Sequence, residues 1–89
     1  MRVVWAPSTV REVWRIHQYV RGFNPRAAAH LADRLLQAGA SLSKDPHRGR
    51  PVPGTGLREL LIVYPYIIRY EIVGGEVHIL RIRHGMRLQ

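Results

Sequence analysis

The sequence predicts an α+β fold in which a helical hairpin packs on a small antiparallel sheet, in the element order β-α-α-β-β-β. Three observations predict this fold. Two segments in the first half repeat apolar residues at helical intervals, a loop rich in proline and glycine follows, and the last third holds three short runs rich in β-branched and aromatic residues. Because 89 residues suit one domain and no linker or repeat divides them, we expect a single domain over residues 1–89.

The first two predicted elements are a short strand and a helix. Arg2–Trp5 is an apolar segment suited to a strand, and Pro7 suits the first turn of a helix. Thr9 and Glu12 have the spacing of a capping box, in which the two side chains satisfy backbone amides at the helix start. Gly22 is expected to end this helix. The apolar residues that recur along one face are Val10, Val13, Trp14, His17 and Val20.

A second helix is predicted after a short break. Asn24 is expected as its N-cap and Pro25 as its first residue. Its apolar residues step by three and four positions and are Ala28, Leu31, Leu35, Ala38 and Leu42. Because the break is short, the two helices are expected to form an antiparallel hairpin. Most aromatic residues are interpreted as core or helix-packing residues, namely Trp5, Trp14, Tyr19, Phe23 and Tyr66.

The remainder of the chain is interpreted as a loop and three strands. Residues 45–56 carry three prolines and three glycines and are expected to have no regular structure. Leu57–Val63, Tyr66–Val73 and residues 76–83 have the composition of strands. Gly74-Gly75 suits a two-residue hairpin turn that requires positive φ between the last two strands.

The chain is strongly basic, with a formal charge of +8. Such a charge predicts an anionic partner, which is nucleic acid, an acidic protein or both. The sequence has no cysteine, which excludes disulfides, thiol catalysis and cysteine-bound zinc. It also has no apolar run near the ~20 residues of a membrane span and no signal-peptide pattern. We therefore expect a cytoplasmic protein that does not bind a membrane.

Positive charge gathers on the last predicted strand. Residues 77–89 contain three arginines, two histidines and no carboxylate. Arg81 and Arg83 are two residues apart and so share one face of the strand, whereas Leu80 and Ile82 are expected on the other face. This pattern predicts a surface that binds an anion.

Two more arginines are expected beside this group. Arg69 should point away from the core, and Arg58 opens the first of the three strands. Arginines placed in this way can bind phosphates or carboxylates in bidentate fashion, or they can merely keep an exposed sheet face soluble. Glu59 and Glu71 are expected to pair across strands with Arg69 or Arg58.

The sequence offers one candidate acid–base residue. His84 directly follows the last strand, where it can transfer protons near neutral pH or simply make a loop hydrogen bond. No Ser-His-Asp arrangement, metal-ligand spacing or phosphate-binding glycine loop is present in the sequence. We therefore expect neither a metal nor a cofactor.

Several segments, taken with the predicted architecture, resemble the ParE branch of the RelE/ParE toxin superfamily. The matching segments are GRP at 49–51, LRE at 57–59, YIIRYEI at 66–72 and ILRIRHGMR at 79–87. The opening VVWAPSTVREVWRIHQYV and the Asn24-Pro25 helix start are also similar. The resemblance therefore covers essentially the whole chain.

The resemblance implies a toxin of a type II toxin–antitoxin module, of the kind linked to plasmid stabilisation and growth inhibition. An acidic, ParD-like antitoxin would hold it inactive by wrapping around it. The resemblance also implies one of two targets. RelE-like members cleave mRNA in the ribosome with basic residues, whereas ParE-like members poison DNA gyrase with no established chemistry of their own.

The ribonuclease pattern of the superfamily is only half matched. By the resemblance, Arg58 and Arg87 keep two of its basic positions, but Leu60 and Ile67 replace two others. The tyrosine expected beyond the last arginine has no counterpart. We therefore expect a gyrase inhibitor rather than an enzyme. The alternatives are a metal-independent endoribonuclease that uses His84 and Arg87, and a non-toxic remnant that only binds its antitoxin.

The resemblance and the charge pattern together predict two binding surfaces. The residues expected to face the target are Arg58, Arg69, Arg81, Arg83, His84 and Arg87. The residues expected to bind the antitoxin lie on the helical hairpin and the sheet and are Val10, Val13, Trp14, Leu31, Leu35, Arg69 and Arg81. An amphipathic partner helix would cover the apolar members while its acidic residues meet the arginines.

Overall fold

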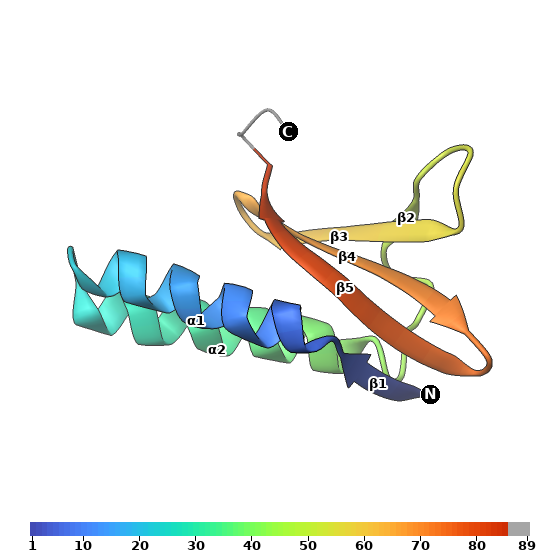
Figure 1. Ribbon diagram of the computed structural model, residues 1–89, viewed down its shortest axis with the longest axis horizontal. Helices are drawn as coiled ribbons and strands as arrows, with labels where there is room; N and C mark the ends of the chain where they lie inside the picture. Colours follow the sequence, from blue (N-terminus) through green and yellow to red (C-terminus); the bar gives the residue numbers. More distant parts are fainter. Residues whose placement is uncertain (86–89) are drawn as a thin grey trace.

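The computed structural model describes residues 1–85, apart from the side chains of residues 62 and 63. Its two layers are a helical hairpin and a sheet (Figure 1). The helices are α1 (Pro7–Arg21) and α2 (Pro25–Ser41). The strands are β1 (Arg2–Trp5), β2 (Arg50–Pro51), β3 (Leu57–Val63), β4 (Tyr66–Val73) and β5 (Glu76–His84). The predicted α+β class is confirmed. Within residues 1–85, neither helix is long and apolar enough to cross a membrane.

The sheet is mixed and has the strand order β1-β5-β4-β3-β2. The strands β2 to β5 pair antiparallel, whereas β1 pairs in parallel with β5. The expectation that residues 45–56 lack regular structure was wrong at Arg50–Pro51, which pair with Glu59 and Arg58. Proline is tolerated there because β2 is an edge strand, so its missing amide interrupts no central ladder.

The first helix begins differently from the expected capping box. Ala6 is the N-cap and Pro7 the first helical residue, so Thr9 already lies inside the first turn. The Thr9 hydroxyl donates back to the Ala6 carbonyl instead of capping an amide. Glu12 is then free to reach across to the sheet, where its carboxylate accepts a hydrogen bond from the backbone amide of Ile82. The capping-box prediction was therefore wrong.

The second helix begins as expected. The side chain of Asn24 accepts a 3.1 Å hydrogen bond from the amide of Ala27, and Pro25 is the first helical residue. The two signals agree because the cap satisfies an otherwise unpaired amide and proline has no amide to satisfy. Gly22 directly follows the end of the first helix, also as expected.

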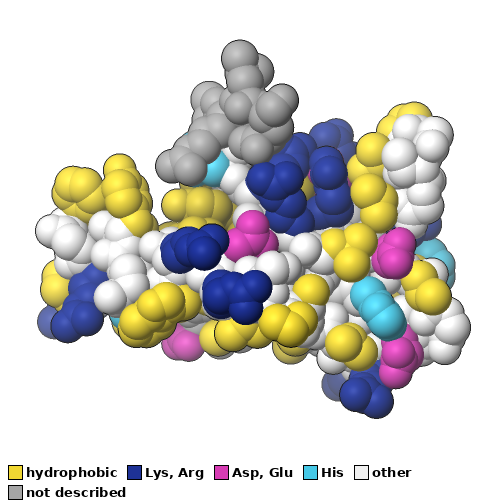
Figure 2. Space-filling model, viewed as in Figure 1, with side chains coloured by type: hydrophobic (Ala, Val, Ile, Leu, Met, Phe, Trp, Pro, Cys, Tyr) yellow, Lys and Arg dark blue, Asp and Glu magenta, His cyan; other side chains and the backbone are white. Residues whose placement is uncertain are grey.

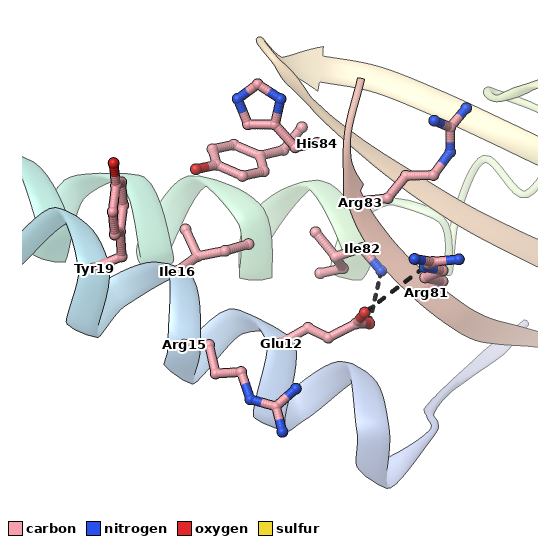
Figure 3. Close-up of a pocket in the computed structure, with 9 residues that line it drawn as sticks. Glu12, Arg15, Ile16, Tyr19, Arg81, Ile82, Arg83 and His84 are labelled. Carbon is pink, nitrogen blue, oxygen red and sulfur yellow. Dashed lines mark hydrogen bonds and ion pairs between the residues drawn. The ribbon is translucent and has the colours of Figure 1, made fainter. Parts of the chain in front are cut away.

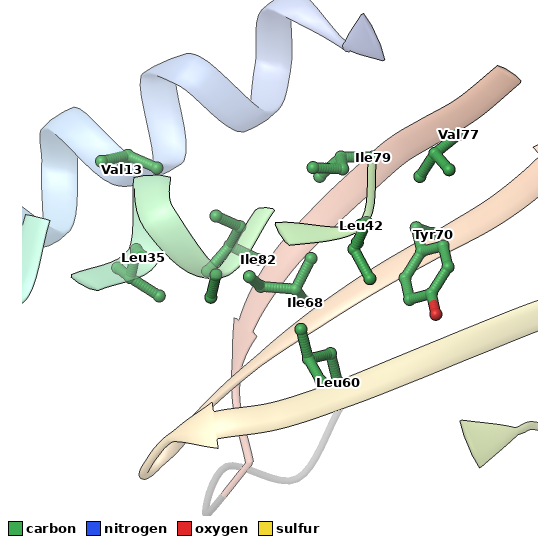
Figure 4. Packing of buried hydrophobic residues seen from close by; sticks show 10 residues of the cluster. Val13, Leu35, Leu42, Leu60, Ile68, Tyr70, Val77, Ile79 and Ile82 are labelled. Carbon is green, nitrogen blue, oxygen red and sulfur yellow. The ribbon is translucent and has the colours of Figure 1, made fainter. Parts of the chain in front are cut away.

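The core lies between the helical hairpin and one face of the sheet (Figure 4). Tyr70, Leu35, Leu42, Ile68 and Ile79 are its largest fully buried apolar side chains. They come from both helical and strand segments, so burial of apolar surface holds the two layers together.

A β-bulge changes the alternation of side chains along β5. Arg69 lies opposite Arg81 and Tyr70 lies opposite Ile79, so Leu80 is an extra residue without a partner. The prediction of a simple alternation, with Leu80 and Ile82 on one face, did not include this bulge. Ile79 and Ile82 are buried, and Leu80 is half-buried.

Three aromatic residues that were interpreted as core or helix-packing residues are exposed. Trp14, Tyr19 and Phe23 are 59%, 64% and 76% exposed, because the first helix packs on the sheet through its Val13 and Ile16 side instead. Trp5 and Tyr66 pack against the core as predicted. The first helix thus exposes aromatic rings beside charged side chains such as Arg11 and Arg15.

Candidate functional site

A buried carboxylate holds two of the predicted target-facing arginines on the sheet. Glu59 on β3 lies opposite Arg69 on β4, and Arg83 on β5 approaches diagonally, because it lies opposite Ile67, two residues before Arg69. Arg69 Nη2 and Nε donate to Glu59 Oε2 at 2.6 and 3.0 Å, and Arg83 Nη2 donates to the same oxygen at 3.3 Å. We call these three residues the Glu59 cluster. The predicted pairing of Glu59 with Arg69 is confirmed.

The ionised form of Glu59 is strongly favoured within this cluster. Burial by itself would raise the pKa of its carboxyl, but the hydrogen bonds and positive charges of Arg69 and Arg83 lower the pKa below its usual value. The carboxylate therefore stays charged at neutral pH and offsets one of the two guanidinium charges. Arg83 Nε is buried and makes no hydrogen bond within the described residues.

Arg58, also predicted to face the target, holds the preceding loop. Its guanidinium Nη1 donates to the carbonyl oxygens of Gly49 and His47, at 2.6 and 3.3 Å. The Tyr70 hydroxyl holds the same loop, because it donates to the Pro46 carbonyl and accepts from the Gly49 amide. A side chain at position 49 would come within 2.7 Å of the Tyr70 ring, which explains the glycine there.

A cleft of about 360 Å³ lies between α1 and the end of β5 (Figure 3). Its lining includes Arg81, Arg83 and His84 from the predicted target-facing set, and Arg15 and Tyr19 from the first helix. The His84 and Tyr66 rings meet edge to face, with their centroids 5.3 Å apart. Figure 2 shows basic side chains around an acidic one on this face of the molecule. Arg87 lies outside the described residues.

One carboxylate crosses the cleft. Glu12 Oε1 accepts a 3.0 Å hydrogen bond from the amide of Ile82, and its Oε2 lies 3.9 Å from Arg81 Nε. Sequence reasoning assigned Glu12 to a capping box and missed this role. The only available signal was its place on the same side of the helix as Ile16, which packs against the core.

A second hollow, of about 300 Å³, is almost entirely apolar and lies on the outer side of the hairpin. Its lining includes Val10, Val13 and Trp14 from the predicted antitoxin-binding set, together with Ala32 and Leu36. The Trp14 ring stacks on the ring of His17, with centroids 5.8 Å apart. We call this feature the apolar hollow.

Two members of the predicted antitoxin-binding set belong to the core. Leu35 is fully buried, and Val13 is 7% exposed and contributes both to the core and to the lining of the apolar hollow. Leu31 is partly buried against the same core. Leu36, which the prediction missed, is 47% exposed because it lies one residue further around the helix than Leu35. The sequence signal for it was its spacing of four residues from Ala32.

No group of three or more His, Cys, Asp or Glu side chains that could hold a metal ion occurs within the described part of the chain. The site consists of arginines, the carboxylates of Glu59 and Glu12, and an apolar surface. Such groups can bind an anionic or amphipathic partner.

Comparison with known proteins identifies the class. Residues 3–89 match the family described as ParE toxin of type II toxin-antitoxin system, parDE. The protein is therefore the toxin of a type II toxin–antitoxin system, which has an antitoxin as its partner. The chain belongs to the ParE toxin family, as the resemblance in its motifs predicted.

Individual relatives agree with this class. The chain is 46% identical over 87 residues to Toxin RelE2 of Caulobacter vibrioides, with 98% of each chain covered. It is 42% identical to Toxin RelE1 of the same organism, over 83% of this chain and 76% of the relative. A solved structure described as a chromosomal ParDE TA system from P. aeruginosa has the same fold, with a TM-score of 0.83, 23% identity and coverage of 94% and 95%.

Proposed function

We propose that the protein, once released from its antitoxin, inhibits DNA gyrase in the cytoplasm through protein–protein contacts. The surface that meets gyrase comprises the basic end of the sheet and the cleft beside it, with Arg81, Arg83, His84 and Arg87 as its principal residues. Arg58 and Arg69 contribute from the adjoining sheet face. No chemical step by the toxin is required.

The Glu59 cluster is the observation that carries this proposal. A phosphodiester-cleaving site needs positive donors aimed at the charge that develops on phosphate, and an acid–base pair. Arg69 and Arg83 instead donate to the Glu59 carboxylate, and Arg58 donates to two backbone carbonyls. Leu60, at one of the positions that the ribonuclease pattern reserves for a basic residue, is buried at 6% exposure. These groups stabilise the sheet and leave few donors for RNA.

One observation favours the second candidate, a ribosome-dependent endoribonuclease. His84 lines the same cleft as Arg81 and Arg83, so a proton-transfer group and two guanidiniums lie near one another. The names of the relatives RelE1 and RelE2 also favour this candidate, because RelE-like toxins are the ones expected to cleave mRNA. The gyrase proposal is preferred because Arg83 is bound by Glu59.

For the antitoxin, we propose that an acidic amphipathic helix covers the apolar hollow. Val10, Trp14 and Leu36 are exposed there, and burying such a surface is the usual gain when a helix docks in a groove. The net charge of +8 favours a partner of opposite sign.

Variants of the basic surface test the proposal on purified toxin. Arg81→Ala and Arg87→Ala should each weaken inhibition of gyrase supercoiling by about tenfold, because rim and surface arginines each contribute on the order of 1 kcal/mol at an interface. Arg50→Ala, on the opposite edge of the sheet, is the control and should inhibit like the parent. Full inhibition by both Arg81→Ala and Arg87→Ala would refute this surface.

A further inference from the structure

The last part of β5 has a neighbouring strand on only one side. β1 pairs with β5 from Glu76 to Ile79, and the amide of Ala6 then bonds to the Ile79 carbonyl as the chain turns into α1. β4 covers the other side of β5 through to His84. Within residues 1–85, the outer edge of positions 80–84 therefore carries no paired strand. Such an edge is a template for an added strand.

A side chain occupies the hydrogen-bonding position at this edge. The Ile82 amide points outward and donates to Glu12 Oε1 at 3.0 Å, where a neighbouring strand would present a backbone carbonyl (Figure 3). The Glu12 side chain is 24% exposed, so it is largely enclosed but still reachable. Exchanging a carboxylate for a carbonyl at this amide replaces one hydrogen bond with another. Glu12 thus occupies this position in the free toxin and can be displaced by a backbone carbonyl.

The cleft lies directly beside this edge and is basic. Arg15, Arg81 and Arg83 line it together with the carboxylate of Glu12, and Arg83 is also bound by Glu59. Ile16 and Ile82 add apolar surface between the charged groups. An occupant with a free backbone, carboxylate side chains and some apolar surface matches all of these features.

We propose that the open edge of β5 binds an extended, acidic segment of the antitoxin as an added strand. A backbone carbonyl of the segment replaces Glu12 at the Ile82 amide, and its carboxylates bind Arg15 and Arg81. This inference rests on the antitoxin partnership of the proposed function but not on the identity of the toxin's target. It is a second contact, separate from the helix-binding hollow on the other side of α1.

An extended segment fits the edge better than a helix does. The carbonyls along a helix are already bonded within the helix, so only its end could accept from the Ile82 amide. An extended chain presents a carbonyl at every second residue along one edge. A small anion could bind Arg15, but the nearby Glu12 carboxylate would repel it. It also has no extended backbone that could pair with β5.

The test uses synthetic peptides that tile the antitoxin encoded beside the toxin, titrated onto the full-length toxin. The tightest peptide is then made with single N-methyl groups at alternate residues. N-methylation removes one backbone donor and keeps every side chain. Methylation of amides that point toward β5 should weaken binding by about tenfold or more, because each loses a hydrogen bond. Methylation of amides that point away from β5 should have little effect. Equal losses at both sets would overturn the strand geometry.

Variants of the toxin give the second readout. Arg15→Glu should weaken binding by about tenfold, and the matched reversal Arg50→Glu on β2 should not. Glu12→Ala removes the carboxylate that competes for the Ile82 amide and repels an acidic segment, so it should strengthen binding several-fold. Without peptide, the Ile82 amide should exchange faster in Glu12→Ala than in the parent toxin. Adding the unmethylated peptide to Glu12→Ala should slow this exchange again. Failure of the peptide to protect Ile82 in that variant would also overturn the proposal.

The outcomes separate this inference from the proposed function. If the free toxin blocks gyrase supercoiling and the intact antitoxin restores it while no peptide protects Ile82, the edge proposal falls and the gyrase proposal stands. If a peptide binds the edge and the free toxin leaves gyrase untouched, the edge proposal stands and the gyrase proposal falls.

Discussion

Glu59 is the residue on which the character of the basic surface depends most. Its carboxylate accepts hydrogen bonds from Arg69 and Arg83, on two neighbouring strands, and converts two potential phosphate ligands into a structural network. The pairing with Arg69 was predictable, because cross-strand partners on one face pair when their charges are opposite. The contribution of Arg83 was not predictable, because it depends on how β5 aligns with β4.

Glu59→Gln should destabilise the fold by about 1–3 kcal/mol, because two guanidiniums lose their shared charged acceptor. The folded-state pKa of Glu59 lies below its usual 4.5, so the stabilisation is present above that pH and is lost as the pH falls through the lower folded value. Urea unfolding at pH 7 and pH 3 measures both effects. The variant should lose less stability on acidification than the parent. Glu71→Gln, which lies opposite Leu57 and not Arg69, is the control.

Tyr70 also stabilises the fold through hydrogen bonds, but its hydroxyl carries no charge. Tyr70→Phe removes the hydroxyl that joins the Pro46 carbonyl and the Gly49 amide, and should cost about 1–2 kcal/mol because that amide is left buried. Hydrogen exchange at Gly49 should accelerate. The exposed Tyr19→Phe is the matched control and should change neither quantity. An unchanged exchange rate at Gly49 would show that other contacts hold the loop.

At the scale of elements, the strands and helices were largely predictable and the faces they present were not. Asn24-Pro25 and Gly74-Gly75 marked boundaries correctly, because each residue type suits the backbone conformation required there. The bulge at Leu80 shifts the alternation of side chains along β5, so that Ile79 and Ile82 are both buried, and no residue type predicts a bulge. Likewise, the apolar stripe of α1 is wider than its buried part, so periodicity alone does not show that Trp14 is exposed.

Gly39 shows how two layers constrain one helical residue. A methyl group there would lie 2.3 Å from Cζ2 of Trp5 and 3.0 Å from a methyl of Ile79. Glycine to alanine in a helix normally stabilises by up to about 1 kcal/mol. Here Gly39→Ala should instead destabilise by about 1–3 kcal/mol, because it overpacks the contact between α2 and β1. Thermal unfolding measures the sign, and a raised melting temperature would contradict the packing described.

The apolar hollow gives a prediction for the hairpin as a binding element. Trp14→Ala should leave stability nearly unchanged but weaken antitoxin binding by about 30-fold, because a buried tryptophan contributes about 2 kcal/mol at an interface. Phe23→Ala removes an even more exposed aromatic ring outside the hollow and is the control. Calorimetric titration with the antitoxin measures both. Equal affinity for Trp14→Ala and the parent would place the antitoxin helix elsewhere.

At the scale of the whole molecule, the fold class and the family followed from the sequence because the motifs lie in the right order along nearly all of it. The mixed sheet did not follow, because the short β1 carries no signal for whether it pairs in parallel or antiparallel. The candidate site followed only in part. Arg81, Arg83 and His84 do meet in one cleft, whereas the partners of Arg58 and Arg69 depend on contacts between distant residues.

At the same scale, the central claim is the proposal that this toxin binds a protein target and does not cut RNA, and the arginines held by Glu59 support it. The most direct test compares gyrase supercoiling with cleavage of ribosome-bound mRNA, using the same full-length toxin with and without its antitoxin. We predict that the toxin blocks supercoiling, that the antitoxin restores it, and that the mRNA stays intact. Cleavage of the mRNA with unchanged supercoiling would contradict the account.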